Sequence, residues 1–498
     1  MPIHIFFIKG KALISTYFRQ IILLVTPLSC ISLNACITPP ANDSLSLTTT
    51  LPTRWQYAKP ALAIHSTPDK PNSKIGWQPF HDKALAQRIE KALKKNDDLA
   101  AAAIRVQRAQ WQLALADSRF LPNIEASIGV QTGNVLAEQS AWKPSFNAQA
   151  QLNYEIDLWG KLSSQKSAAA WLLAASEDDR DSVALILIGD VAATYWKQCF
   201  TQLRIIRQQQ QIENAKKIKA LVALRYETGS TSLLEKKEAQ ETLAQHQAML
   251  AKLMQQAVEY SQAMSILLNN MTITSNDSDY YLSTSHQTFS SPSPSLNTSI
   301  LPTLPAIPDV NAHIPAATLA QRPDVRAAER RVRTAIATQQ ANQLSLYPAI
   351  NLTASTGTAS AALVDILRNP ITTLGVKLAL PFLQWQERKI QWQLSKTETQ
   401  ERVIAFQQTL YKAFSEVEIA LAAHQHFAKQ QQALTVALAA AKDAERLYEI
   451  RYSTGAIALR PWLDAQNRVF QAENELNEIQ LNALINYVKL YQALGGAE

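Results

Sequence analysis

The sequence predicts a mainly α-helical protein that also carries four two-faced β-strands and consists of two consecutive copies of one unit. Three features lead to this prediction. The 498 residues include only 12 glycines, and long stretches lack proline, which favours extended helices. An internal repeat returns at a constant offset. Strict alternation of apolar and polar residues marks the strands.

The internal repeat is recognised from two pairs of matching segments. "RFLPNIEASIGVQTG" from Arg119 matches "SLYPAINLTASTGT" from Ser345, with Pro122 aligned to Pro348. "RYETG" at Arg225 matches "RYSTG" at Arg451. Both pairs give the same offset, since 348 minus 122 and 451 minus 225 are each 226. A register held over this distance indicates that a whole structural unit is duplicated.

The strands are clearest at residues 146–158, "FNAQAQLNYEIDL", which alternate without interruption. A strand with this period gathers its apolar side chains on one face. The opposite face is hydrophilic and includes Gln151, Asn153, Glu155 and Asp157. Such a strand fits a half-buried soluble sheet, and it equally fits a barrel strand between lipid and water. Each half offers two strands, residues 124–131 with 146–158 and residues 350–356 with 372–382.

Long helices are predicted at residues 163–224 and 387–450, which contain no proline and are rich in Ala, Leu, Gln, Glu and Lys. Each ends before one of the two matching turns, and a second helix returns at residues 234–268 or 461–494. Gly229 and Gly455 are expected to end the long helices in the left-handed backbone region. A helix also precedes each first strand, with Asp98 and Asp324 in its first turn near the positive end of the helix dipole.

The termini and the segment between the repeats have different compositions. Residues 1–35 are basic and then apolar, as in a signal peptide. The letters "LNAC" resemble a bacterial lipobox, which implies acylation of Cys36; the alternative is ordinary cleavage near Ala35 with Cys36 incidental. Residues 36–74 are then a lipid-anchored tether, 75–271 the first repeat, 272–314 a linker rich in Ser, Thr and Pro, and 315–498 the second repeat.

Charge and motifs argue against several classes of function. The net charge is +7, and removal of the three basic residues of the signal leaves 45 minus 41, about +4, without a basic cluster typical of nucleic-acid binding. No catalytic, metal or cofactor motif is present. His424 and His426 point to different faces of a helix, and Cys199 is expected to be a small buried residue. Glu155 and Asp157 are better explained by a polar strand face than by an acid and base pair.

The sequence resembles the outer membrane efflux family, the TolC-like outer membrane factors, and in particular their lipoprotein branch. The resemblance covers nearly all of the mature chain. It rests on "WQPFHDKALAQRIEKALKKNDDLAAAAIRV" from Trp77, "YEIDLWGK" from Tyr154, "LAQRPDVRAAERRV" from Leu319, "FSEVEIAL" from Phe414, "RYSTG" with "LDAQNRV" from Leu463, and "LYQALGG" from Leu490. Together these motifs are highly specific.

The resemblance implies a homotrimer in which four strands from each protomer close a 12-stranded transmembrane β-barrel, continued by a long α-helical barrel through the periplasm. The trimer explains how four strands per chain can cross a membrane: the strands of three chains pair into a closed barrel and leave no unpaired edge, which lipid does not tolerate. It also places Leu152, Tyr154 and Ile156 against outer-membrane lipid. The polar residues of the same strand, from Gln151 to Asp157, then line an aqueous duct.

The same resemblance places the two turns at the periplasmic mouth, where the adaptor (membrane fusion) protein docks. Arg451 and Tyr452 resemble gate residues that hold the mouth closed, Arg225 and Tyr226 are their counterparts in the first repeat, and Asp464 resembles an acidic residue at the constriction. The chain departs from the family pattern at Arg460 and Pro461. We expect Arg460 to pair with an acidic group near the mouth, for which Asp464, four positions later on the same helix, is one candidate.

The function implied is that of a passive outer-membrane exit duct for drugs or other small toxic compounds, without enzymatic activity. An inner-membrane resistance-nodulation-division pump would drive export, and a periplasmic adaptor would connect the two. An exit duct for type I protein secretion is the alternative within transport. A periplasmic hydrolase and a coiled-coil scaffold are disfavoured, because neither explains four two-faced strands that recur in phase with the repeat.

Overall fold

The computed structural model describes residues 82–133, 142–270, 316–361, 370–380 and 384–496. All of them belong to one compact unit, Pro52–Glu498. The signal peptide, Cys36, the tether and the linker predicted from the sequence lie outside the described residues. Among the helices described, none is both long and apolar enough to cross a membrane.

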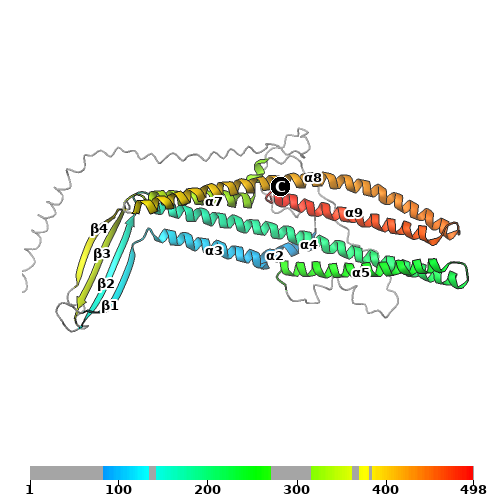
Figure 1. The fold of residues 1–498 in the computed structure, drawn as a ribbon, viewed down its shortest axis with the longest axis horizontal. Coiled ribbons are helices and arrows are strands. Elements are labelled where there is room, and N and C mark those ends of the chain that lie inside the picture. The colour runs from blue at the N-terminus through cyan, green and yellow to red at the C-terminus, as the bar shows by residue number, and fades with distance from the viewer. Residues whose placement is uncertain (1–81, 134–141, 271–315, 362–369, 381–383, 497–498) are drawn as a thin grey trace, which may run out of the picture. The chain divides into compact units, whose positions relative to one another are not determined.

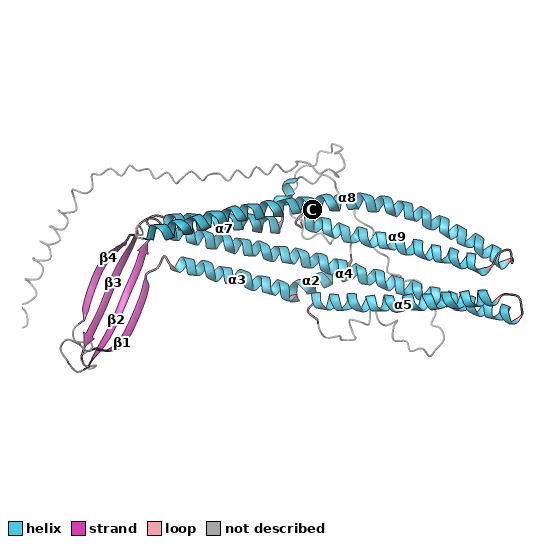
Figure 2. Cartoon of the chain, viewed as in Figure 1, coloured by secondary structure: helices cyan, strands magenta, loops and turns pink. Residues whose placement is uncertain are grey.

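Four antiparallel strands form one sheet in the order β1-β2-β3-β4 (Figures 1 and 2). Their bounds are β1 Asn123–Gly133, β2 Lys143–Ile156, β3 Ala349–Ser360 and β4 Ile371–Ala379. The pairing of β2 with β3 joins the two repeats in the middle of the sheet. The four predicted strands are therefore confirmed, and β1 and β4 are the edge strands of the sheet.

The register gives the sheet one apolar and one polar face. Leu152 lies opposite Ile124 on β1 and Ala354 on β3, and Ala354 in turn lies opposite Leu374 on β4. In the alternate row, Gln151 lies between Glu125 and Ser355. Because side chains alternate across a pleated sheet, this pairing extends the two-faced pattern of one strand over all four.

Two predicted strand ends are corrected. β4 ends at Ala379, short of the predicted residue 382, and the second strand also ends early. β2 stops at Ile156, so Asp157 is not part of the strand. Its carboxylate accepts hydrogen bonds from the backbone N–H groups of Leu162 at 2.9 Å and Ser163 at 2.8 Å. These donors belong to the first turn of a helix, where N–H groups have no partner within the helix. The alternation of polar and apolar residues in the sequence extends beyond the strand because Asp157 is polar for another reason: its carboxylate caps the helix that follows.

The helices repeat with the same offset as the sequence. In the first repeat they are α2 Lys83–Lys95, α3 Asp97–Ser118, α4 Lys161–Glu227 and α5 Leu233–Leu267; in the second they are the 3-10 helix η3 Ala316–Gln321, α7 Pro323–Leu344, α8 Trp385–Ser453 and α9 Leu459–Ala493. The starts of α7 and α3 differ by 323 minus 97, and those of α9 and α5 by 459 minus 233, which is 226 in both cases. The 67-residue α4 is about 100 Å long at 1.5 Å per residue.

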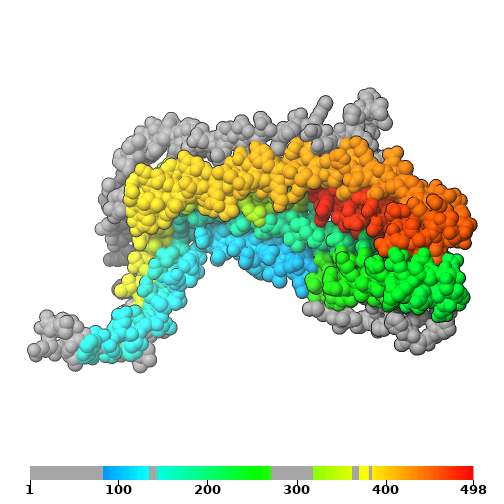
Figure 3. Space-filling view, turned by 45° about the vertical axis from the view of Figure 1, so that its right-hand side comes forward, coloured from blue at the N-terminus to red at the C-terminus, as the bar shows by residue number. Residues whose placement is uncertain are grey.

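The long helices α4 and α8 organise the packing. α4 contacts α3 and α5, and it also contacts α7 and α9 of the second repeat; α8 contacts α7 and then α9. α7 and α9 therefore occupy successive parts of the space between α4 and α8 (Figure 1). The far ends of the α4–α5 and α8–α9 hairpins lie together in the space-filling view (Figure 3).

The main hydrophobic core lies where α2 packs beside α4, α5 and α9. Ile89 of α2, Val191 and Trp196 of α4 and Leu484 of α9 are each at most 1% exposed. Met264 of α5 belongs to the same cluster. α2 is short, but its buried face closes this part of the helical layer.

Two equivalent residues hold the helix ends in this region. Asn96 precedes α3, accepts a hydrogen bond from the Leu99 N–H at 3.1 Å and donates to the carbonyl of Leu267, the last residue of α5, at 3.1 Å. Arg322, its counterpart in the second repeat, precedes α7 and donates to the carbonyl of Ala493, the last residue of α9, at 3.0 Å. In each repeat, the residue before one helix thus satisfies a terminal carbonyl of another.

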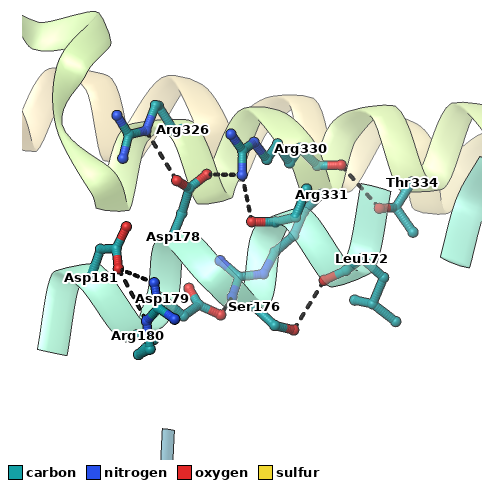
Figure 4. A network of polar contacts seen from close by, with 11 residues as sticks. Leu172, Ser176, Asp178, Asp179, Arg180, Asp181, Arg326, Arg330, Arg331 and Thr334 are labelled. Atoms are coloured by element: carbon teal, nitrogen blue, oxygen red, sulfur yellow. Dashed lines mark hydrogen bonds and ion pairs between the residues drawn. The ribbon is translucent and has the colours of Figure 1, made fainter. Parts of the chain in front are cut away.

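A buried carboxylate joins the two repeats between α4 and α7 (Figure 4). Asp178, with its side chain 4% exposed, lies 3.0 Å from Arg326 Nε and 2.8 Å from Arg330 Nη1. Arg330 also donates to the Ala174 carbonyl at 2.6 Å. Burial raises the pKa of Asp178, although the two arginines favour its charged form. Desolvation of the buried charges offsets much of their attraction, so these ion pairs add little net stability. We therefore expect them mainly to fix the position of α4 against α7.

Candidate functional site

The turns that join each hairpin have the same backbone geometry. Gly229 and Gly455 have φ of +70° and +74°, in the left-handed region. Ser230 N–H donates to the Arg225 carbonyl at 2.7 Å, and Ala456 N–H donates to the Arg451 carbonyl at 2.8 Å. With the accompanying bonds from each glycine to the tyrosine carbonyl, this is a Schellman motif. The predicted left-handed caps are confirmed. We call residues 222–239 the first tip and residues 448–465 the second tip.

The side chains of the two tips are not equivalent. Arg225 is half-buried and Tyr226 is exposed, whereas Arg451 is exposed and Tyr452 is only 6% exposed. The guanidinium of Arg451 forms no ion pair within the part of the chain that the structure describes. The repeat therefore preserves the backbone of the turn, but each arginine and each tyrosine has its own environment.

Tyr452 joins the two tips. Its ring stacks on Trp462 of α9 with 5.1 Å between centroids, and the guanidinium of Arg225 lies 5.2 Å from the ring centroid. Val222 of α4 and Leu463 of α9 complete the same apolar cluster. Burial raises the pKa of the Tyr452 phenol, and the charge of Arg225 opposes that effect. The first tip thus supplies both apolar and cationic contacts to the second.

Glu235 forms a second connection between the tips. α9 begins at Leu459 after Ala458, which has no side chain that can cap the helix. Glu235 of α5 accepts a hydrogen bond from the Leu459 N–H at 3.2 Å, and the Thr231 hydroxyl donates to the same carboxylate. A carboxylate at a helix N-terminus is favoured by the free N–H group and by the helix dipole.

Arg460 and Asp464 form the ion pair predicted from their spacing. Arg460 Nε lies 3.1 Å from Asp464 Oδ1. Arg460 Nη1 also lies 3.9 Å from Glu238 Oε1 of α5. Arg460 therefore extends from the second tip toward the first, and the side chain of Glu238 is largely buried at 16% exposed.

Three residues of this site were not anticipated from the sequence. They are Glu235, Glu238 and Trp462, and all three follow the turns rather than precede them. For Glu235 and Trp462 the signal was available in the repeat: residues 234–236 are Leu-Glu-Lys and the equivalent residues 460–462 are Arg-Pro-Trp. Glu238 carries no such signal, because its counterpart Asp464 is also acidic. The difference between otherwise matched turns thus marks two of the three positions where the tips contact each other.

The polar residues predicted to line the duct, from Gln151 to Asp157, extend along β2 to the start of α4. Gln151 donates to Asn153 at 3.1 Å, and Glu155 pairs with Lys161, the first residue of α4, at 2.6 Å. Asp157 instead caps α4, as described above. Cys199 of α4 is half-buried beside the main core. No cluster of three His, Cys, Asp or Glu side chains suited to a metal ion occurs among the described residues.

Comparison with known proteins assigns the fold and the family. The family model of outer membrane efflux proteins matches residues 88–270 and 314–496. Pyoverdine export outer membrane protein OpmQ of Pseudomonas putida is 30% identical over 491 residues, with 95% of this chain and 97% of that protein covered. Cation efflux system protein CusC of Escherichia coli K12 is 26% identical over 427 residues, which cover 84% of this chain and 88% of that one.

Solved structures show the same architecture. A crystal structure of CusC superposes with a TM-score of 0.74 at 22% identity, covering 87% of this chain and 99% of that one. The open state of the MtrE channel of Neisseria gonorrhoeae superposes with a TM-score of 0.72 at 24% identity, covering 90% and 95%. These are TolC-like outer-membrane channels with a tandem repeat, as expected from the sequence. The chain belongs to the outer membrane efflux protein family.

Proposed function

We propose that this protein is the outer-membrane duct of a tripartite efflux system and acts as a passive homotrimer without an active site of its own. The observation that carries the proposal is the four-stranded sheet, which has one apolar face, one polar face and two edge strands. Three such sheets can pair edge to edge, and closure removes the unpaired strand edges that lipid does not tolerate.

In this arrangement the apolar face meets lipid and the polar face lines the duct. Ile128 and Leu374 on the apolar face are 82% and 80% exposed in the isolated chain, which is costly unless lipid covers them. Gln151, Asn153 and Glu155 then face water. Asn153→Cys should react with a membrane-impermeant maleimide in intact trimers, while Leu152→Cys should not. Equal labelling of both positions would contradict this orientation.

At the other end, the two tips form the periplasmic mouth and the docking place of an adaptor protein. By their names, the relatives OpmQ and CusC serve pyoverdine export and cation efflux, which makes pyoverdine-like compounds and cations candidate substrates beside drugs. The inner-membrane partner separates these classes from protein secretion. Crosslinking in cells followed by mass spectrometry should recover a proton-driven pump with its adaptor, whereas recovery of an ATP-driven exporter would assign the duct to type I secretion.

The anchor is proposed separately, because residue 36 lies outside the described residues. If Cys36 is acylated, cells should incorporate radioactive palmitate into this protein, and Cys36→Ser should abolish the label. Persistence of the label in that variant would refute the lipobox interpretation.

A further inference from the structure

A cavity of about 600 Å³ lies beside the place where the end of α9 meets the start of α7. Its lining comes from four helices, because residues of α4 and α8 border it on either side of α7 and α9. The volume is within the range of about 300–1,000 Å³ that is typical of small-molecule sites. The cavity, which we call the wall pocket, is therefore large enough for a compound of drug size.

The lining of the wall pocket is largely apolar, although much of it is open to solvent. Ile186 of α4 and Ile419 of α8 are 53% and 66% exposed. Phe427 of α8 and Ile485 of α9 are half-buried and also line the pocket. Single exposed apolar side chains are common on any protein, whereas several gathered in one hollow are typical of a binding surface. The wall pocket therefore favours a ligand with an apolar body.

Two lysines of the wall pocket have free ammonium groups. Lys412 of α8 and Lys489 of α9 are exposed, and neither forms an ion pair or hydrogen bond with any residue that the structure describes. The two carboxylates of the lining, Asp324 and Glu416, both pair with Arg322, at 2.8 and 2.7 Å. Three cations and two carboxylates leave the lining with a net charge of +1. The charge that remains available is that of the lysines, and it complements an anionic group.

The wall pocket lies on the opposite side of α4 from α2. The Tyr195 hydroxyl of α4 donates to Asp82, the residue before α2, at 2.8 Å, and the Arg88 guanidinium of α2 lies 4.8 Å from the centroid of the Tyr195 ring. Ile186 precedes Tyr195 by nine residues, which is two and a half turns at about 3.6 residues per turn. A further helix inside a ring of helices would obstruct a duct, so we place α2 on the outer wall. In the proposed trimer the wall pocket then opens toward the duct.

We propose that the wall pocket binds amphipathic anions as they pass through the duct. An aromatic or alkyl body would lie against Ile186, Ile419 and Phe427, and a carboxylate or sulfonate would pair with Lys412 or Lys489. The proposal rests on the proposed duct and names a class of compound for which its wall has affinity. Three such pockets, one in each chain, would raise the concentration of these anions within the duct.

Two fluorescent probes that differ by one anionic group test the wall pocket. 8-Anilino-1-naphthalenesulfonate carries an apolar body and a sulfonate, and N-phenyl-1-naphthylamine has the same body without the sulfonate. Both are titrated into the full-length protein in phosphatidylcholine nanodiscs, and the signal of empty nanodiscs is subtracted. Lys412→Ala and Lys489→Ala should each raise the Kd of the sulfonate probe by about fivefold. The Kd of the neutral probe should change by less than about twofold, because no ion pair is lost.

Lys429→Ala is the matched control, because Lys429 is an exposed lysine of α8 that does not line the wall pocket. It should leave both Kd values unchanged, and Lys412→Arg, which keeps the charge, should retain binding of the sulfonate. Unchanged sulfonate binding in both pocket variants would overturn the proposal. Equal weakening in Lys429→Ala, or equal weakening of the neutral probe, would overturn it as well.

The source of the ligand is tested by mass spectrometry of the purified protein. The unaltered chain should carry no bound fatty acid or phospholipid that Lys412→Ala releases. If such a lipid is present in the unaltered chain and lost in the variant, the wall pocket holds a membrane lipid, and the proposal that it binds exported compounds is refuted.

The position of the wall pocket on the duct is tested separately. In a chain with Cys36 and Cys199 replaced by serine, Asn482→Cys places a thiol in the lining. In intact trimers this thiol should react with N-ethylmaleimide, which can enter the duct, but not with a maleimide coupled to dextran, which is too large. Reaction with both reagents would place the pocket on the outer wall and refute the binding of compounds in transit. If the purified chain is monomeric, the proposed duct fails instead, while the titration with two probes still decides whether the pocket binds anions.

Discussion

Arg322 should hold the end of α9 in place. Its side chain is 8% exposed and donates to Ala493 O at 3.0 Å and to Glu416 Oε2 at 2.7 Å, besides its local pair with Asp324. A hydrogen bond from a charged donor contributes about 1.5–3 kcal/mol. We take about 2 kcal/mol for the buried Ala493 carbonyl and about 1 kcal/mol for Glu416, whose side chain is 40% exposed.

Arg322→Ala should therefore lower the local stability at the end of α9 by about 3 kcal/mol, which corresponds to about a hundredfold faster hydrogen exchange. Hydrogen exchange of the last α9 amides, followed by mass spectrometry on intact trimers, measures this loss when reclosing is faster than exchange. Asn96→Ala, the equivalent change in the first repeat, removes one neutral hydrogen bond to the end of α5, that to the Leu267 carbonyl, and should accelerate exchange there by about fivefold.

Lys94→Ala is the matched control, because among the described residues Lys94 pairs only with Glu90 on the solvent side of α2, where both side chains are at least 67% exposed. It should change exchange by less than about threefold. If Arg322→Ala accelerates exchange at the end of α9 by less than tenfold while the trimer stays folded, the reasoning about this guanidinium is wrong.

Three further changes test other parts of the structure. Gly455→Ala should lower the free energy of unfolding by about 1 kcal/mol, because a side chain is strained at φ +74°. An unchanged midpoint of thermal unfolding, measured by circular dichroism, would contradict this. Burial lowers the pKa of His246, so below about pH 6.5 the unfolded chain binds a proton that the folded chain does not. The free energy of unfolding should therefore fall from pH 7 toward pH 5. His246→Gln should reduce the slope of the free energy of unfolding against pH. If the slope is the same in both chains, His246 is not its source. Asp157→Ala should accelerate exchange at the start of α4 about tenfold, whereas Glu155→Gln should have a smaller effect; the reverse order would mean that the ion pair with Lys161 matters more than the cap.

The elements of the fold could be predicted because each depends on local pattern. The alternation around Leu152 indicated a strand, and the absence of proline throughout 163–224 and 387–450 favoured the long helices α4 and α8. The constant offset then transferred each prediction from one repeat to the other. Gly229 and Gly455 were correctly expected in the left-handed region, since the end of a helix before a returning helix requires it.

The tertiary structure alone decided which residues of different elements meet. Asp157 follows the strand pattern but caps α4, and Glu235 lies on an ordinary helical surface in the sequence but caps α9. Neither role has a periodic signature, because each depends on the position of an N–H group supplied by another element. The sequence by itself determined the repeated unit and its strands, helices and turns. The packing of one repeat against the other determined the contacts between the tips, because those contacts join residues that lie far apart in the chain, such as Glu235 with Leu459 and Arg225 with Tyr452.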